Sequence, residues 1–188
     1  KALEAGEDAQ ALYFEAVDHL LDMQATPADA SSIAHSRPYD HKMMRFEFSL
    51  FTDWYIEGIL KTPIAAEDRA RFELLFDQVI EQLQEQPVAF VHRDYHSRNL
   101  MWRGAHGLGV IDFQDAVMGP VTYDLASLLR DCYVAWDAPF REKVMKYWWQ
   151  GAAERLNYPV EWSRFQVDFD LMALQRNLKA IGIFGRLS

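Results

Sequence analysis

The chain has 188 residues, of which half are hydrophobic and 25% are charged, as in folded globular proteins rather than disordered chains. Its net charge of −9 argues against nucleic acids and anionic membranes as partners, because both attract a basic surface. The single cysteine excludes an internal disulfide framework and a cysteine-based zinc cluster.

Three helices are predicted in the first half of the chain. Apolar residues at helical spacing predict the first over residues 7–24, and a Ser-, Asp- and Pro-rich loop is expected over 26–41. Crowded aromatic residues predict a second helix over 46–59. An apolar stripe predicts a third over 67–86.

Short apolar runs bounded by turn residues then replace the helical pattern, which is typical of buried strands. Strands are predicted over 88–92 and 108–111, with a further short strand over 99–102. Gly104 and Gly107 are expected to form the turn of a hairpin between the last two.

The rest of the chain is again helical in pattern. Amphipathic segments predict helices over 121–136, 139–156 and 162–184, with Pro120 and Pro139 in first turns. Helices, a small β element and further helices in this order indicate an α+β fold that is mainly helical.

The residues that indicate chemistry follow the first predicted strand. The pattern H-R-D-x-x-x-x-N runs from His92 to Asn99. A second acidic site, Asp112 followed by Phe113, comes after the next apolar strand, 18 residues beyond Asp94. Strand, motif, hairpin, strand and D-F together form a much more specific pattern than an isolated H-R-D triplet.

Phosphoryl transfer from ATP explains this spacing. The reaction needs a carboxylate that orients the attacking hydroxyl and accepts its proton, together with oxygen ligands for Mg²⁺. Asp94 can serve as the first, while Asn99 and Asp112 can converge on the metal. The alternative is that both aspartates are turn or cap residues and Asn99 is a loop residue, which leaves the full pattern unexplained.

These residues resemble the aminoglycoside phosphotransferase and choline kinase superfamily, the small-molecule relatives of protein kinases. The aromatic helix, HRDYHSRN, IDFQDA, GPVTYDLASLL and the long last helix occur in family order and cover most of the chain. Within the superfamily, the chain is most similar to bacterial kinases of the anomeric hydroxyl of N-acetylmuramate and N-acetylglucosamine, which belong to cell-wall sugar recycling. The resemblance implies that residues 1–188 are the C-terminal lobe of a protein-kinase-like fold.

The resemblance also implies roles for the motif residues. Asp94 resembles the catalytic base, and Asn99 and Asp112 resemble the ligands of Mg²⁺ in an ATP-dependent reaction.

Three further residues are expected to support the catalytic loop: His92, Arg93 and Asp124. Asp124 is similar to a buried family aspartate that braces this loop by hydrogen bonds. It is also placed where a carboxylate interacts favourably with a helix N-terminus, and both roles are compatible.

Five residues occupy positions near the acceptor cleft of this family: Glu47, Trp54, Tyr55, Asp115 and Arg176. The resemblance implies contact with the substrate, and a packing or surface role is an equal alternative for each of them.

Two departures from protein kinases favour a small-molecule acceptor over a protein. His96 stands where Ser/Thr kinases typically have Lys, and no A-P-E segment follows Asp112. The glycine-rich loop and strand lysine of a kinase are also missing from these residues. The N-terminal nucleotide-binding lobe is therefore expected to lie upstream of Lys1, and this chain alone is expected to be inactive.

The sequence thus predicts an ATP- and Mg²⁺-dependent phosphotransferase of a small hydroxyl acceptor, favouring the anomeric hydroxyl of an N-acetyl amino sugar. Aminoglycoside, choline or homoserine-type acceptors are alternatives within the class. A pseudokinase-like binding module or a helical interaction domain with a vestigial site is an alternative of another class, although the intact Asp94, Asn99 and Asp112 argue against it. No apolar stretch reaches the ~18 residues of a membrane span, and a cytoplasmic location is expected.

Overall fold

The computed structural model describes residues 3, 6–27, 29 and 31–188, and helices dominate it. The α-helices are α1 Ala9–Gln24, α2 His41–Leu50, α3 Ala66–Gln84, α4 Tyr123–Leu129, α5 Ala138–Arg155 and α6 Trp162–Leu187. The strands are β1 Val88–Val91, β2 Leu100–Trp102, β3 Leu108–Val110 and β4 Val117–Pro120. Two short 3₁₀-helices, η1 Ala34–Ser36 and η3 Gly104–His106, and a π-helix, η2 Phe51–Ile59, complete the elements.

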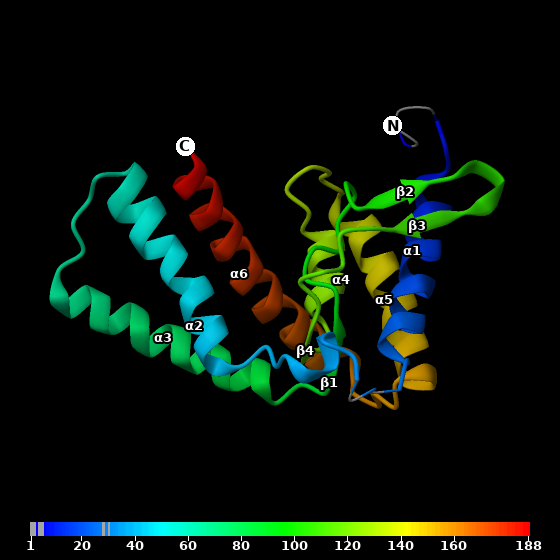
Figure 1. Ribbon diagram of the computed structural model, residues 1–188, viewed down its shortest axis with the longest axis horizontal. Helices are drawn as coiled ribbons and strands as arrows, with labels where there is room; N and C mark the ends of the chain where they lie inside the picture. The colour runs from blue at the N-terminus through cyan, green and yellow to red at the C-terminus, as the bar shows by residue number, and fades with distance from the viewer. Residues whose placement is uncertain (1–2, 4–5, 28, 30) are drawn as a thin grey trace.

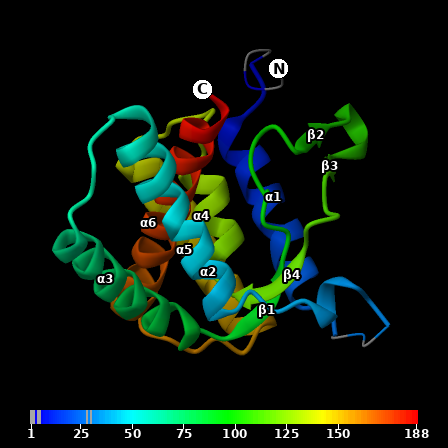
Figure 2. The same ribbon diagram turned by 60° about the vertical axis from the view of Figure 1, so that its left-hand side comes forward.

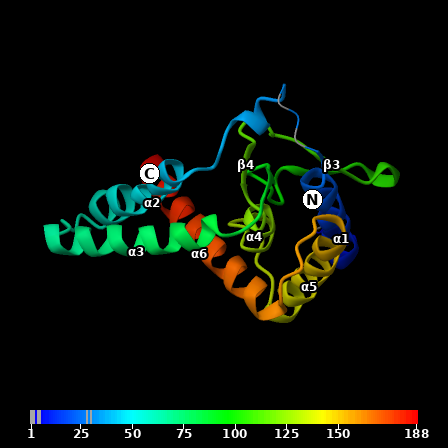
Figure 3. The same ribbon diagram turned by 90° about the horizontal axis from the view of Figure 1, so that it is seen from below.

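The helices form two groups that meet at α6 and α4. Helices α1 and α5 pack together on one side, and α2 with α3 forms an arm on the other (Figure 1). Seen from below, α6 crosses between the arm and the rest of the helices (Figure 3). A continuous apolar core joins them, with fully buried Trp148 and Phe165 among its largest side chains.

Helix starts follow from capping side chains in the sequence. The carboxylates of Asp8, Asp40 and Asp137 accept backbone N–H hydrogen bonds at the starts of α1, α2 and α5. Pro139 lies in the first turn of α5, as predicted.

Two antiparallel strand pairs lie between the helices. Strands β2 and β3 form the predicted hairpin, in which Leu100 is opposite Val110 and both Gly104 and Gly107 have positive φ. This hairpin lies beside α1, away from α2 and α3 (Figure 2). Strand β1 pairs with β4.

Strand β4 is absent from the sequence prediction, which placed Pro120 in the first turn of a helix. Pro120 instead ends β4 and is opposite Val88, at the end of the two-stranded ladder where its missing N–H costs nothing. The helix starts three residues later, at Tyr123.

The prediction of one helix over 121–136 is also wrong at its C-terminal end. Helix α4 ends at Leu129, and Asp131 accepts hydrogen bonds from the backbone N–H of Ser97 (2.9 Å) and Tyr133 (2.8 Å). These bonds turn the chain away from the helix axis and attach it to the loop after β1.

The second predicted helix, over 46–59, begins earlier, with α2 at His41, and continues into the π-helix η2. Helix α6 packs closely on this junction. A Cβ atom on Gly182 would lie 2.3 Å from the carbonyl carbon of Leu50, and one on Gly185 would lie 3.0 Å from the carbonyl oxygen of Trp54. Gly182 therefore permits a backbone-to-backbone approach that a side chain would block, and at Gly185 an added Cβ would make a tight contact.

The other predicted helices agree with α1, α3, α5 and α6 within a few residues at their ends. The predicted loop over 26–41 contains η1, and its residues 28 and 30 lie outside the described residues. Among the helices that the structure describes, none is long and apolar enough to cross a membrane.

Candidate active site

The loop between β1 and β2, residues 92–99, carries the H-R-D motif and is called the HRD loop below. Asp124, in the first turn of α4, is completely buried and accepts hydrogen bonds from the backbone N–H of His92 (2.6 Å) and Arg93 (3.0 Å). Burial raises the pKa of Asp124 to about 7, although these two N–H donors and the charge of Arg176 lower it. The carboxylate thus fixes the first two residues of the loop.

Arg93 is held at three points. Besides its N–H bond to Asp124, its carbonyl accepts a hydrogen bond from Arg176 (2.8 Å), and its guanidinium donates to Glu47 (2.6 Å). Its φ of 75° lies in the left-handed region, which costs a non-glycine residue about 1–3 kcal/mol. Such a conformation persists only where surrounding contacts determine it, as they do here.

Asn99 joins the two acidic positions of the motif. Its side-chain amide donates to the backbone carbonyl of Asp94 (2.9 Å) and to the carboxylate of Asp112 (3.3 Å). Asp112 follows β3 in a left-handed conformation with φ of 70°, and its second oxygen accepts from the side chain of Gln114 (2.8 Å). The structure therefore brings Asp94, Asn99 and Asp112 together, as the spacing predicts.

The Asp94 carboxylate is half-buried and accepts no hydrogen bond from any residue that the structure describes. Its backbone carbonyl, by contrast, accepts from both Asn99 and the N–H of His96 (3.0 Å). The backbone of Asp94 is therefore held by hydrogen bonds, while its carboxylate is left without a donor among the described residues.

Asn99 and Asp112 offer oxygen atoms that could hold Mg²⁺. Residues 3, 6–27, 29 and 31–188 contain no group of three or more His, Cys, Asp or Glu side chains arranged to hold a metal. Mg²⁺ does not need such a group, because it is commonly bound by only one or two protein carboxylates and completes its coordination shell with water and phosphate oxygens. The exposed Asp112 beside the Asn99 amide matches that requirement.

A buried cluster of charges lies beneath the HRD loop. Glu47, on α2, is 2% exposed, and both of its oxygens are saturated. One oxygen accepts from Arg93 (2.6 Å) and Lys179 (2.8 Å), and the other from Tyr39 (2.5 Å) and Gln175 (2.9 Å). Burial alone would raise the pKa of Glu47, but the Lys179 ammonium, these hydrogen bonds and Arg93 lower it to about 2.

The five residues predicted near an acceptor lie in three parts of the structure. Glu47 and Arg176 lie under the HRD loop, where Arg176 also stacks over the ring of Tyr123 (4.8 Å). Trp54, which is 43% exposed, lies with Tyr55 on η2, and Asp115 is exposed after β3.

Sequence reasoning missed Tyr39, Gln175 and Lys179 in this cluster. On α6, Lys179 is three residues from the predicted Arg176 and four from Gln175, so both pairs are neighbours on the helix surface, and this spacing is the one sequence signal that could have found them.

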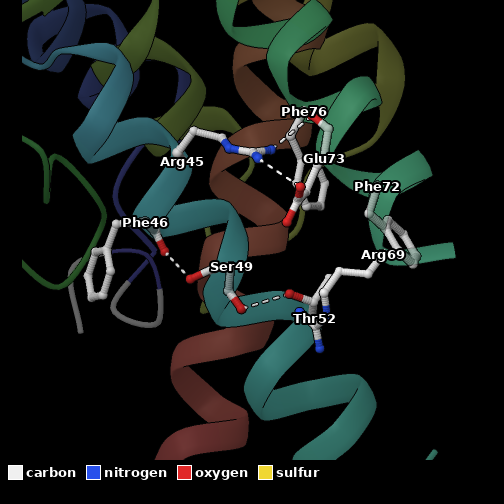
Figure 4. A pocket seen from close by; sticks show the side chains of 8 residues that line it. All are labelled: Arg45, Phe46, Ser49, Thr52, Arg69, Phe72, Glu73 and Phe76. Atoms are coloured by element: carbon white, nitrogen blue, oxygen red, sulfur yellow. Dashed lines mark hydrogen bonds and ion pairs between the residues drawn. The ribbon is translucent and has the colours of Figure 1, made fainter. Parts of the chain in front are cut away.

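A separate cavity of about 260 Å³ lies between α2 and α3 (Figure 4). Arg45 crosses it to the backbone carbonyl of Glu73 (2.8 Å), and Arg69 pairs with Asp53 (3.2 Å). None of its lining residues belongs to the HRD loop or to the segment after β3. They are Arg45, Phe46, Ser49, Thr52, Arg69, Phe72, Glu73 and Phe76.

Solved kinase structures share this fold. The gentamicin–APH(2'')-IIa complex aligns with 95% of this chain and 62% of that chain, at 22% identity and a TM-score of 0.57. Choline kinase from Cryptosporidium parvum Iowa II aligns with 93% of this chain and 60% of that chain, at 13% identity and a TM-score of 0.61. These likenesses confirm the predicted helix-rich, protein-kinase-like fold class.

Curated relatives are closer in sequence. The N-acetylmuramate/N-acetylglucosamine kinase of Pseudomonas putida is 38% identical over 182 residues, which are 96% of this chain and 52% of the relative. The protein of that name from Neisseria meningitidis is 38% identical over 187 residues, which are 98% of this chain and 54% of the relative. The chain thus spans about half the length of these relatives. Residues 2–158 match the phosphotransferase enzyme family (APH), and because this match covers most of the chain, the chain belongs to that family.

Proposed function

We propose that the chain is the C-terminal lobe of an ATP- and Mg²⁺-dependent kinase that phosphorylates the anomeric hydroxyl of an N-acetylated amino sugar. The observation that carries the proposal is the double hydrogen bond of Asn99, which links the backbone of Asp94 to the exposed carboxylate of Asp112. The family membership and the names of the 38% identical relatives support the reaction and the acceptor class.

Asp94 takes the role of general base in this proposal. Its carboxylate, free of protein donors among the described residues, accepts the proton of the attacking hydroxyl and orients that oxygen toward the phosphorus. An anomeric hydroxyl is more acidic than an ordinary alcohol, so a weak carboxylate base is a better match for it. Asp124 and Arg93 keep the base in place from the protein side.

Asn99 and Asp112 hold the metal in this proposal. Mg²⁺, when bound, would neutralise charge on the ATP phosphates. Ile111 and Phe113, which flank Asp112 in sequence, and Met101 on β2 are exposed apolar residues that an additional nucleotide-binding lobe would cover in this proposal. ATP as the donor is consistent with a cytoplasmic enzyme.

In this proposal, side chains on η2 and in the segment between β3 and β4 supply the acceptor side. Trp54 and Tyr55 offer aromatic faces, and the exposed Asp115, just before β4, offers a carboxylate, as a sugar site requires. Glu47 is left out of the acceptor site because its four hydrogen-bonding positions are occupied by protein donors.

An acceptor panel on the full-length protein tests this proposal. N-acetylmuramate, N-acetylglucosamine, kanamycin, choline and homoserine would each be incubated with MgATP, and the products identified by phosphorus NMR. A sugar 1-phosphate, formed by wild type and lost in Asp94→Asn, is the expected result. Phosphorylation of aminoglycosides or choline with inert sugars would overturn the acceptor assignment, and binding of a sugar without any transfer would favour a binding module.

A further inference from the structure

We propose that Glu47 is a positioning residue, which sets the conformation of the HRD loop through Arg93 and so fixes the place of Asp94. The proposal concerns how α2 and α6 support the loop; only its turnover measurement rests on the proposed function.

The charges of this cluster depend on one another. Arg93 and Lys179, 17% and 12% exposed in their side chains, both contact the same oxygen of Glu47, which is itself 2% exposed. Each cation has lost most of its contact with water, and Glu47 is the carboxylate that both contact. Removing the negative charge would leave two cations close together in a poorly hydrated space.

The backbone of Arg93 shows what this cluster acts on. Its left-handed φ of 75° is unfavourable for arginine, and the next residue is Asp94. Glu47 holds the Arg93 side chain, Asp124 its N–H and Arg176 its carbonyl. Loss of the first contact frees the side chain and lets the backbone leave this conformation, which displaces the Asp94 carboxylate.

The contacts also form a closed ring around the start of the loop. Lys179 donates to the hydroxyl of Tyr123 (3.0 Å), and Tyr123 precedes Asp124, which accepts from the N–H of Arg93. Arg93 completes the ring at Glu47. Helices α2, α4 and α6 therefore all contact Arg93 of the HRD loop. Glu47 makes the contact from α2.

A purely structural role for Glu47 is the competing explanation, and the chain provides a matched control for it. Asp168 is buried to the same degree, 2% exposed, and accepts from Tyr158 (2.6 Å) and Arg164 (2.8 Å). Its side chain makes no hydrogen bond to residues 92–99 in the described structure. Replacing either acid by its amide disturbs a buried, hydrogen-bonded carboxylate, but only Glu47→Gln touches the HRD loop.

The test compares full-length wild type, Glu47→Gln and Asp168→Asn. For Glu47→Gln we expect kcat per folded molecule to fall by about 10–10²-fold, as for small misplacements of a reacting group, with KM for MgATP little changed. Amide hydrogen exchange of residues 92–99 should become faster in the same variant. Asp168→Asn should retain the wild-type kcat and loop exchange even where its melting temperature falls.

A double variant separates action through Arg93 from an independent effect. If Glu47 acts through Arg93, then Glu47→Gln combined with Arg93→Gln should have the kcat of Arg93→Gln alone. Should Glu47→Gln fail to fold, Arg93→Lys makes the same test, because it keeps a cation but shortens its reach to Glu47; kcat should fall at constant KM for MgATP.

Wild-type kcat and loop exchange in folded Glu47→Gln would overturn the proposal, as would an equal loss in Asp168→Asn. If the wild-type enzyme phosphorylates none of the acceptors, the proposed function fails, and hydrogen exchange alone then decides the role of Glu47.

Discussion

The side-chain amide of Asn99 lies 3.3 Å from the carboxylate of Asp112, thirteen residues further along the chain. The same amide donates to the backbone carbonyl of Asp94. One side chain thus connects the loop after β1 to the residue after β3, so the position expected to hold the metal and the backbone of the expected base are linked. Separate substitutions should nevertheless distinguish the two aspartates, because the Asp112 carboxylate accepts hydrogen bonds from Asn99 and Gln114, whereas that of Asp94 accepts none from the described residues.

Asp94→Asn and Asp112→Asn in the full-length protein should differ in which kinetic constant they change. Loss of the base should lower kcat by about 10²–10⁴-fold and leave the affinity for MgATP largely intact. Loss of the Asp112 charge should instead weaken MgATP binding, since it removes a carboxylate from the metal position. Steady-state kinetics with nucleotide titration calorimetry would measure both effects. Equal effects on nucleotide affinity would contradict the assignment.

The 188-residue chain alone should show negligible phosphate transfer from ATP. It has no G-x-G-x-x-G segment and no lysine in a V-A-I-K-like strand, the two parts with which a kinase holds the phosphates. Labelled-ATP turnover by the purified chain, checked for folding by circular dichroism, is the measurement, with the full-length protein as the positive control. Turnover by the chain comparable to that of the full-length protein would contradict the expectation that the phosphate-binding parts lie outside these 188 residues.

The helices and the hairpin could be predicted because their signals are local. Amphipathic spacing marks α1, α3, α5 and α6, and the glycines at 104 and 107 mark the hairpin turn. The proximity of Asp94, Asn99 and Asp112 was also predictable, since Asp94 and Asn99 lie in one short loop and Asp112 follows β3, which pairs with β2 just after Asn99.

The parts that were missed depend on distant residues. Helix α4 ends early because Asp131 bonds to Ser97, 34 residues away in sequence. Strand β4 contains Gly119 and Pro120, which indicate a turn when read alone, and only pairing with β1 makes a strand of them. The environment of Glu47 depends on Gln175, 128 residues away, so its burial carries no local signal.

Gly182→Ala should destabilise the full-length protein by about 1–3 kcal/mol, the usual cost of inserting a methyl group into a well-packed contact. The new Cβ would lie 2.3 Å from the carbonyl carbon of Leu50, which is backbone and cannot rotate away, so α6 must move from α2. Gly58→Ala is the control, since its Cβ would meet only an ordinary contact at 3.4 Å. Thermal unfolding would measure both, and equal melting temperatures would argue against the close approach of α6.

Glu47 and Asp124 should give the stability of the protein opposite pH dependences. Burial raises the pKa of Asp124 from 3.8 to about 7, so the folded state holds the extra proton, and the free energy of unfolding falls as the pH rises from about 4 to 7. The pKa of Glu47 is lowered from 4.5 to about 2, because Lys179 and Arg93 outweigh its burial. Its contribution is therefore present above pH 4.5 and is lost as the pH falls toward 2.

Urea unfolding of full-length wild type, Asp124→Asn and Glu47→Gln across this pH range would separate the two contributions. Asp124→Asn should flatten the decline in stability between about pH 4 and 7, because an amide cannot take up the proton that the buried carboxyl holds in the folded state. Glu47→Gln should instead flatten the loss on the acid side, below pH 4.5, while lowering stability overall, because Arg93 and Lys179 lose their shared counter-charge. Each variant controls for the other, since Asp124→Asn should change the stability between about pH 4 and 7 and Glu47→Gln its loss below pH 4.5. If stability still declines between about pH 4 and 7 in Asp124→Asn as it does in wild type, the N–H groups of His92 and Arg93 keep the wild-type Asp124 carboxylate ionised in spite of its burial.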